Sequence, residues 1–269
     1  MRTMKDSASQ TSGGVAMAFR AAIFDVDGVL VDSPHEQAWR DSLARLMAGP
    51  WASIVGQTSY APGRFTSAVY QQHVAGKPRE AGAHAALEYF GIPADQAHVQ
   101  AYCDTKQAQL LALIARGEFT AFDDAIRLLL RFKAAGIRIA SASSSRNADL
   151  FLQRVTLARF AGEFGLFAPG ATLLDMLDAN VNGHAVAHGK PDPAIFLLAA
   201  AALHLEPAGC VVVEDAPAGV QAAKAGGMAC IAVARHDDAA ALRAAGADWV
   251  VPQLDALPSA AIRGVEKGD

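Results

Sequence analysis

Ala22-Ile23-Phe24-Asp25-Val26-Asp27-Gly28-Val29 is an apolar run that ends in two aspartates and a glycine. Bulky apolar residues that stop at a glycine are typical of a buried β-strand. Alternate side chains of a strand share a face, so Asp25 and Asp27 are expected to emerge together at its carboxyl end. In an open parallel sheet, ligands bind at that end. The two carboxylates repel each other, which suggests a bound cation, a shared proton, or one acid and one base. The alternative is that both aspartates only cap the next helix.

The rest of the chain contains two kinds of secondary-structure pattern. Helical patterns separated by Gly–Pro breakers run from residue 33 to residue 117, near 35–48, 65–75, 80–90 and 94–116. From Phe122 onward strand and helix alternate, which predicts an α/β fold with a parallel sheet covered by helices on both faces. The predicted strands are 137–141, 210–213, 229–234 and 248–251, with a weaker one near 175–181, and the predicted helices are 123–135, 147–158, 193–204, 217–225 and 238–245.

This alternation predicts a core made of residues 19–32 and 118–269, with a helical insert at residues 33–117. Residues 1–18 are polar and contain glycine, and they are expected to form a disordered tail without the apolar centre of a signal peptide. The longest apolar run, residues 194–203, is well short of the roughly 20 residues that a membrane span needs.

Charge and cysteine content narrow the class of protein further. The formal net charge of −4 and the absence of long Lys/Arg runs argue against nucleic acid or an anionic membrane as the main partner. Cys103, Cys210 and Cys230 are not in metal-ligand spacing and are typical of buried thiols in a reducing compartment. We therefore expect a cytoplasmic protein that is a monomer or a weakly associating dimer.

Two further strand ends carry groups that suit an anion. The predicted strand 137–141 leads into Ser143-Ser144-Ser145-Arg146-Asn147, and hydroxyls with backbone amides at a helix start can bind an anion or simply cap the helix. In Gly189-Lys190-Pro191-Asp192-Pro193, Asp192 suits a helix N-cap and Pro193 the first helical position. This rigid corner favours a Lys190 directed at an anion over an ordinary surface charge.

A fourth strand end repeats the acidic pattern of the first. Val211-Val212-Val213 is followed directly by Glu214 and Asp215, and adjacent acids at a buried strand end are unfavourable unless a positive charge lies beside them. If the strand ends converge, Asp25, Asp27, Glu214 and Asp215 face Lys190 alone.

A divalent cation would balance this charge. Each close pair of like charges costs about 4 kcal/mol at ~4 Å and an effective dielectric constant of ~20, so one lysine cannot offset four acids and a phosphate. Mg²⁺ is the usual cation where carboxylates meet a phosphate. Together the residues predict a phosphoryl-transfer site with a nucleophile, an acid/base, a phosphate cradle, a lysine and acids for a metal.

The order of these motifs resembles the haloacid dehalogenase superfamily, and within it the β-phosphoglucomutase-like branch. The resemblance covers about residues 20–250 and rests on the motifs Asp-x-Asp-Gly-Val, Ser-Ser-Ser-Arg-Asn, Gly-Lys-Pro-Asp-Pro and Glu-Asp-Ala-Pro-Ala-Gly. It implies a Rossmann-like three-layer α/β/α core with a parallel sheet, and a helical cap inserted after the first strand.

The resemblance also implies roles in the core. Asp25 would be the nucleophile that becomes a phosphoaspartate, Asp27 the general acid/base, and Lys190 the balancing charge. Mg²⁺ would be held by Asp25, Asp215 and the backbone carbonyl of Asp27, with Glu214 at or next to the metal. Ser143 would hold the transferring phosphate. The remaining phosphate-binding residues implied are Gly28, Ser144, Arg146 and Asn147.

In the insert, the resemblance implies substrate contacts from His35, Gly76, Arg79 and Lys106. His35 would relay protons, and Arg79 would bind a second phosphate of the substrate. The alternatives are a helix-start histidine and ordinary surface charges. The chain departs from the mutase pattern at Gly82, where a serine is usual, and between Asp32 and His35, which is about two residues shorter.

The sequence thus predicts a Mg²⁺-dependent enzyme acting on a small phosphorylated sugar through Asp25, most like a mutase that converts glucose 1-phosphate to glucose 6-phosphate. The alternative within the same chemistry is a phosphatase for a sugar phosphate or another small phosphomonoester. A non-catalytic receiver-like module is disfavoured by the length of the chain, and dehalogenase chemistry by Asp27. Phosphonate cleavage through a Schiff base at Lys106 is a second choice to its mutase role.

Overall fold

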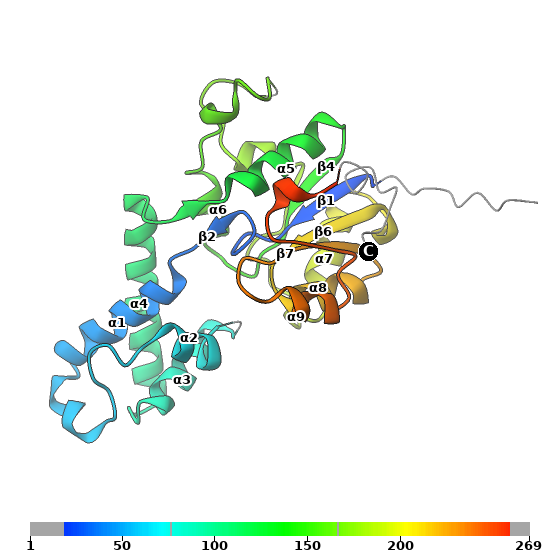
Figure 1. The fold of residues 1–269 in the computed structure, drawn as a ribbon. Coiled ribbons are helices and arrows are strands. Elements are labelled where there is room, and N and C mark those ends of the chain that lie inside the picture. Colours follow the sequence, from blue (N-terminus) through cyan, green and yellow to red (C-terminus); the bar gives the residue numbers. More distant parts are fainter. Residues whose placement is uncertain (1–18, 76, 166, 259–269) are drawn as a thin grey trace, which may run out of the picture. The chain divides into compact units, whose positions relative to one another are not determined.

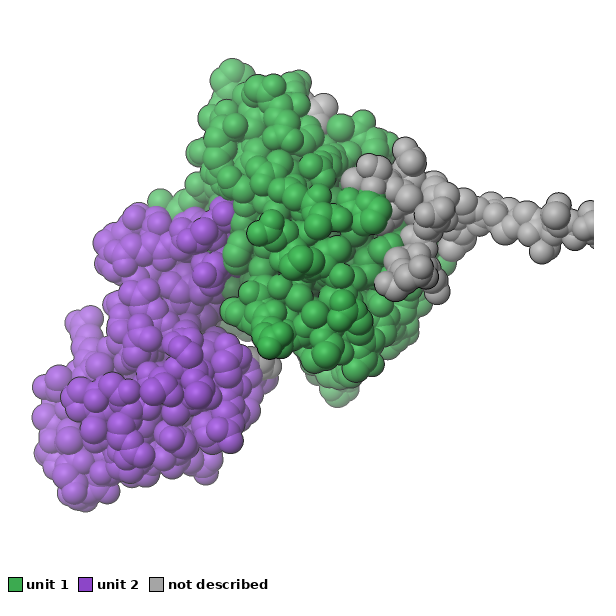
Figure 2. Space-filling view, in the orientation of Figure 1, with its two compact units in different colours: residues 1–30, 122–269 green, residues 31–121 purple. Residues whose placement is uncertain are grey.

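A computed structural model describes residues 19–75, 77–165 and 167–258 of the protein. These residues form two compact units, which Figure 2 shows in green and purple. The first unit contains the described residues up to Leu30 and from Phe122 onward, and the second spans Val31–Ala121. The expected disordered tail, residues 1–18, lies outside the described part of the chain. None of the described helices is long and apolar enough to cross a membrane.

The first unit is built on a six-stranded sheet (Figure 1) with the order β5-β4-β1-β6-β7-β8. Every neighbouring pair of its strands is parallel, which confirms the predicted α/β class. Strands buried on both faces read as continuous apolar runs, as in Val211-Val212-Val213. The strands are β1 (Ala21–Phe24), β4 (Arg138–Ser141), β5 (Ala179–Asn180), β6 (Cys210–Glu214), β7 (Ala229–Val233) and β8 (Trp249–Val251).

Helices cover both faces of this sheet, because successive side chains of each strand point to opposite sides. On one face, Phe24 of β1 packs edge-to-face on Phe132 of α5 (Asp123–Ala134), with ring centroids 6.2 Å apart. On the other face, Ile23 lies in an apolar cluster with Phe196 and Val220. The helices of that face are α7 (Ala194–Ala202), α8 (Pro217–Ala225) and α9 (Ala239–Ala244). The three-layer core implied by the resemblance is therefore confirmed.

The order of the strands places β1 at the topological switch point, where an open parallel sheet binds its ligands. The chain runs from β1 outward to β4 and β5 on one side, and to β6, β7 and β8 on the other. Asp25 N–H donates to the carbonyl of Val213 at 3.0 Å, and Ala142 N–H donates to the carbonyl of Phe24 at 2.9 Å. The residues that follow β1, β4 and β6 thus lie at one edge of the sheet.

The second unit is mainly helical, as the pattern of residues 33–117 predicts. Its apolar core includes Trp39 and Tyr102, whose rings lie 4.8 Å apart, and Tyr102 donates its hydroxyl to the carbonyl of Trp39 at 2.9 Å. Two short antiparallel strands, β2 (Val31–Asp32) and β3 (Thr120–Ala121), close the unit where the chain enters and leaves it. Its helices are α1 (His35–Ala48), the 3₁₀ helix η1 (Ala52–Gln57), α2 (Ser67–His73), α3 (Arg79–Tyr89) and α4 (Gln96–Arg116).

The predicted helix at residues 147–158 is wrong beyond its first half. The helix α6 covers only Ala148–Leu152, and the next residues run alongside the segment 171–173 instead. Leu173 N–H donates to the carbonyl of Val155 at 2.9 Å, and Leu157 N–H donates to the carbonyl of Ala171 at 3.0 Å. The tertiary pairing therefore overrides the local helical pattern. The remaining 3₁₀ helices are η2 (Ala158–Phe160), η3 (Leu174–Met176), η4 (Pro207–Gly209) and η5 (Leu254–Ala256).

Candidate active site

A buried ion-pair network lies at the carboxyl end of β1. The Nζ atom of Lys190 donates to Oδ1 of Asp25 at 2.5 Å and to Oε1 of Glu214 at 2.6 Å. The side chains of Asp25 and Glu214 are 10% and 1% exposed, so water screens these pairs weakly. β1 ends at Phe24, so Asp25 is the first residue beyond the regular strand. The structure thus brings together three of the predicted residues from three distant segments.

The corner before α7 holds Lys190 in this place. Asp192 accepts from the N–H of Ala194 at 2.9 Å, and α7 begins at Ala194, one residue later than the sequence predicted. The Nζ atom of Lys190 also lies 4.7 Å from the centroid of the Phe196 ring, which gives a cation–π contact. Phe196 was not among the predicted site residues, and its ring face stabilises the ammonium group of Lys190.

Both carboxylate oxygens of Glu214 are engaged by donors of the chain itself. Oε1 accepts from Lys190, while Oε2 accepts from the N–H groups of Asp215 at 2.8 Å and Ala216 at 3.0 Å. Gly219, in the first turn of α8, leaves room for this carboxylate, since a β-carbon at residue 219 would lie 1.8 Å from Oε1 of Glu214. This arrangement fits Glu214 next to a metal, where it would anchor Lys190.

Asp215 lies against the turn that carries Asp27. A β-carbon on Gly28 would lie 1.9 Å from Oδ2 of Asp215, so the carboxylate touches the backbone of this turn. Gly28 has a φ of +83°, a backbone conformation that other residues rarely adopt. Gly28 thus serves both the shape of the turn and the approach of Asp215.

The carboxylates of this network outnumber its positive charges. Burial raises the pKa of Asp25 to about 7, even though the charge of Lys190 lowers it, and the charges of Glu214 and Asp27 raise it further. Burial and the charges of Glu214, Asp25 and Asp27 hold the pKa of Asp215 well above its usual range. Burial alone would lower the pKa of Lys190, but the carboxylates of Asp25 and Glu214 outweigh it and raise that pKa. A cation beside Asp25 and Asp215 would relieve this repulsion.

The side-chain donors of this site suit Mg²⁺, which completes its shell with water and phosphate, better than they suit a metal ion bound entirely by protein side chains. Among the described residues, no group of three or more His, Cys, Asp or Glu side chains is arranged to hold a metal ion. Mg²⁺ at phosphate-handling sites usually takes one or two carboxylates and completes its shell with waters and phosphate oxygens. Asp25 and Asp215, both with raised pKa values, match this pattern.

The hydroxyl-rich loop after β4 is ordered by its own hydrogen bonds. Ser143 Oγ accepts from the N–H of Ser145 at 3.1 Å, and Ser145 Oγ accepts from the N–H of Asn147 at 3.3 Å. Ser143 and Asn147 are buried, whereas Ser144 and Arg146 are exposed. Because Phe24 of β1 pairs with Ser141 in the sheet register, Ser143 follows the neighbouring strand end at nearly the same level as Asp25.

Asn182 supports this loop, although the sequence analysis did not select it. Its Oδ1 accepts from the N–H of Ser143 at 3.0 Å, and its Nδ2 donates to Oδ1 of Asp149 at 2.8 Å. Gly183 N–H donates to the carbonyl of Ser143 at 2.8 Å. The signal available in the sequence was the polar segment Asn180-Val181-Asn182-Gly183 at the weakly predicted strand.

In the second unit, the structure brings His35 and Lys106 together. Lys106 is 4% exposed, and its Nζ lies 2.9 Å from Nδ1 of His35 and 5.2 Å from the centroid of the Trp39 ring. Burial, followed by the charges of Lys106 and Arg79, lowers the pKa of His35 to about 3. The imidazole is therefore neutral at pH 7 and accepts from the ammonium group. Lys106 is not an ordinary surface charge, and Gly76 lies outside the described residues.

We expect Gly219→Ala to lower the free energy of unfolding by about 1–3 kcal/mol, because its methyl group would displace the buried Glu214 carboxylate. Urea denaturation would measure this change. Gly162→Ala is the matched control, since a β-carbon at residue 162 meets no atom within 4 Å and its φ is not positive. Equal stability of the two variants would contradict the close contact between Gly219 and Glu214.

Comparison with known proteins gives one consistent family. A family model described as haloacid dehalogenase-like hydrolase matches residues 19–227. A β-phosphoglucomutase of Bacillus subtilis is 31% identical over 243 residues, which cover 88% of this chain and 91% of that protein. A validoxylamine A 7′-phosphate phosphatase of Streptomyces hygroscopicus subsp. limoneus is 29% identical over 238 residues, 88% of this chain and 94% of that protein. The crystal structure of an archaeal β-phosphoglucomutase from a hyper-thermophilic Pyrococcus matches with a TM-score of 0.65 at 26% identity, covering 90% of this chain and 96% of the other.

Proposed function

Because the chain belongs to the haloacid dehalogenase-like hydrolases and is an enzyme of that family, we propose that it transfers the phosphoryl group of a small phosphorylated sugar through a phosphoaspartate at Asp25. The observation that supports this most is the buried contact of Lys190 with both Asp25 and Glu214 at the end of β1. Such a contact favours the ionised form of the carboxylate and fixes its direction in a place where burial favours protonation.

In the proposed reaction, a carboxylate oxygen of Asp25 attacks phosphorus while the ester P–O bond breaks. Asp27 gives its proton to the leaving oxygen, and it later takes a proton from the water or sugar hydroxyl that attacks the phosphoaspartate. Lys190 lowers the pKa of Asp25 and so favours its ionised form, and Glu214 holds Lys190 in position. The transferring phosphate would be bound by Gly28, Ser143, Ser144, Arg146 and Asn147.

The fit of Asp25 and Asp215 supports Mg²⁺ as the cofactor. Together with the backbone carbonyl of Asp27, these two carboxylates would hold the ion. When bound, Mg²⁺ supplies the positive charge that allows a phosphate dianion to approach the carboxylates.

Between the two activities, we favour a mutase of the β-phosphoglucomutase type that converts glucose 1-phosphate to glucose 6-phosphate. Here the unit Val31–Ala121 is the cap, and His35, Gly76, Arg79 and Lys106 contact the substrate. The favouring observation is that the Nζ atom of Lys106 lies 2.9 Å from Nδ1 of His35, and that the charges of both Lys106 and Arg79 lower the pKa of His35. Two cations beside one histidine suit a second phosphate. A phosphatase is the alternative, and the similarity to a validoxylamine A 7′-phosphate phosphatase supports it. The cytoplasmic location and the monomeric or weakly dimeric state stay predictions.

The proposed function is tested by incubating the purified protein with Mg²⁺, β-glucose 1-phosphate and a glucose bisphosphate primer. We expect glucose 6-phosphate to form. Release of free phosphate alone, across a panel of sugar phosphates, would assign the phosphatase instead. Neither product with any substrate would contradict phosphoryl transfer altogether.

Removal of the metal is expected to abolish the same activity. With excess EDTA the four carboxylates have only Lys190 to balance them, so the phosphate dianion is repelled. Activity should fall to background in a coupled assay and return when Mg²⁺ is added in excess over the chelator. Full activity in EDTA would contradict the metal site.

A further inference from the structure

Arg235, two residues beyond the end of β7, makes hydrogen bonds to three residues in two separate segments of the first unit. Its Nη1 and Nη2 donate to the two carboxylate oxygens of Asp124 at 2.9 and 3.0 Å. Its Nε donates to the carbonyl of Gly28 at 3.2 Å, and Nη2 also donates to the carbonyl of Val29 at 3.2 Å. The guanidinium carbon lies 3.8 Å from the centroid of the Phe122 ring. The Arg235 side chain is 12% exposed, so its ion pair with Asp124 is largely buried and is not a surface ion pair.

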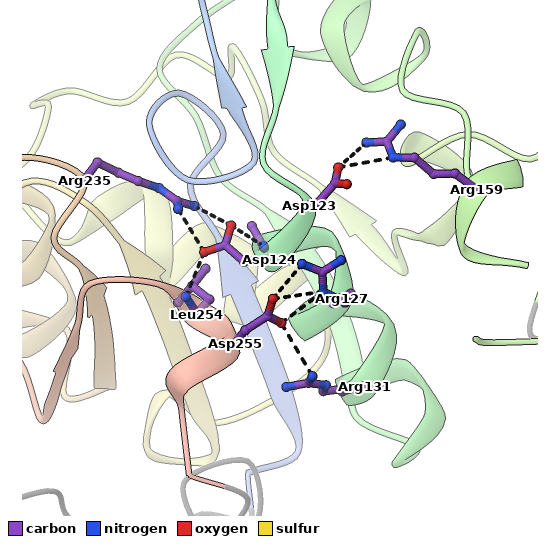
Figure 3. Close-up of polar contacts among 9 residues, drawn as sticks. Asp123, Asp124, Arg127, Arg131, Arg159, Arg235, Leu254 and Asp255 are labelled. Atoms are coloured by element: carbon purple, nitrogen blue, oxygen red, sulfur yellow. Dashed lines mark hydrogen bonds and ion pairs between the residues drawn. The ribbon is translucent and has the colours of Figure 1, made fainter. Parts of the chain in front are cut away.

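Asp124, at the start of α5, is itself fixed. One oxygen of its carboxylate accepts from the N–H of Leu254 at 2.8 Å, and the other accepts from the N–H of Ala125 at 2.9 Å (Figure 3). Because Asp124 cannot shift, the planar guanidinium of Arg235 has one orientation in which it serves both the carboxylate and the two carbonyls.

The two carbonyls belong to the turn that directly follows Asp27. Gly28 carries no side chain to pack and has a φ of +83°, so the turn depends on outside contacts for its position. Arg235 adds to two other outside contacts of this turn, the N–H of Phe122, which donates to the carbonyl of Leu30 at 3.0 Å, and the carboxylate of Asp215 against Gly28. We propose that Arg235 is a positioning residue, which holds the turn so that Asp27 delivers its proton to the leaving oxygen. This inference rests on the proposed function.

A neighbouring ion pair provides a matched control. Arg127 donates to Asp255 from Nε at 3.0 Å and from Nη2 at 2.6 Å, and it ties the same helix α5 to the same C-terminal segment (Figure 3). The hydrogen bonds of Arg127 within the described residues go to Asp255 and not to the turn after Asp27. Loss of Arg127 therefore reports the stability that such a pair provides, without disturbing Asp27.

The test compares two esters that differ in their need for a proton. p-Nitrophenolate leaves without protonation, whereas a sugar alkoxide needs the proton of Asp27. Release of free phosphate from each ester is followed without the bisphosphate primer, so the value of kcat/KM reports the steps up to formation of the phosphoaspartate. We expect Arg235→Gln to lower kcat/KM for the best sugar phosphate by about 10–100-fold and to change that for p-nitrophenyl phosphate little. Arg127→Gln should leave the ratio of the two values as in the wild type.

Partial unfolding lowers both values by the same factor, so the ratio separates positioning from stability. Arg235→Lys keeps the positive charge but loses the planar set of N–H donors, so its ratio of the two kcat/KM values should lie between those of the wild type and Arg235→Gln. This variant replaces Arg235→Gln if the latter does not fold. An unchanged ratio in an active Arg235 variant would overturn the positioning role and leave the proposed function standing. If the wild-type protein showed no turnover, or if its turnover did not require Asp25, both the positioning role of Arg235 and the proposed function would be overturned.

Discussion

Asp25→Asn is expected to lower kcat for phosphoryl transfer by about 10⁴-fold or more, because an amide cannot act as the nucleophile. Asp25 is the carboxylate that Lys190 contacts at 2.5 Å, and it directly follows β1. The measurement is product formation from the best sugar phosphate with saturating Mg²⁺. Asp32→Asn is the matched control, since Asp32 is exposed and lies outside the buried network. Comparable loss in both variants would contradict the assignment of Asp25.

The same substitution should not weaken the fold at neutral pH. In the metal-free protein the pKa of Asp25 is raised from its ordinary value of 3.8 to about 7, so between these pH values the folded state binds more protons than the unfolded state. The free energy of unfolding then falls as the pH rises through this window. Asp25→Asn removes this loss, so its stability relative to the wild type should be greater at pH 8 than at pH 4. Urea denaturation in EDTA at both pH values checks the sign, and the opposite trend would contradict the buried repulsion.

Lys190→Met is expected to lower the free energy of unfolding of the metal-free protein by about 3–5 kcal/mol, because it leaves two buried carboxylates without their partner. It should also abolish turnover, since Asp25 would then be protonated at neutral pH. Urea denaturation in EDTA measures the first effect.

Lys133→Met provides the control for this loss. Lys133 pairs with Asp178 at 2.7 Å, but their side chains are 29% and 34% exposed. Exposed pairs of this kind contribute about 0–1 kcal/mol. If the two lysine variants were equally stable, the network at Lys190 would not be the buried charge centre described above.

The fold and the centre of the site could be predicted because both depend on local patterns. Polar residues stand at or directly after the ends of β1, β4 and β6, and the carboxyl ends of parallel strands share one edge of the sheet. Asp25, Lys190 and Glu214 therefore converge although Asp25 and Lys190 are 165 residues apart. The excess of acids in this region likewise follows from the sequence, and the raised pKa values of Asp25 and Asp215 agree with it.

The supporting residues could not be predicted in the same way. Asn182 and Arg235 act through long-range hydrogen bonds from loops, and no periodic pattern marks such contacts. Arg235 did carry one signal, as the first charged residue after the apolar run 229–234. Strands β2 and β3 have only two residues each, which is too short for an alternating pattern to appear.

Chemical trapping of the phosphorylated enzyme would test the role of Asp25 most directly. The protein would be mixed with substrate and Mg²⁺, quenched in acid and treated with borohydride, which reduces an aspartyl phosphate to homoserine. Peptide mass spectrometry then locates the reduced residue. We expect homoserine at position 25 and no reduction at Asp27 or Asp215. Reduction at another aspartate, or at none while product still forms, would contradict phosphoryl transfer through Asp25.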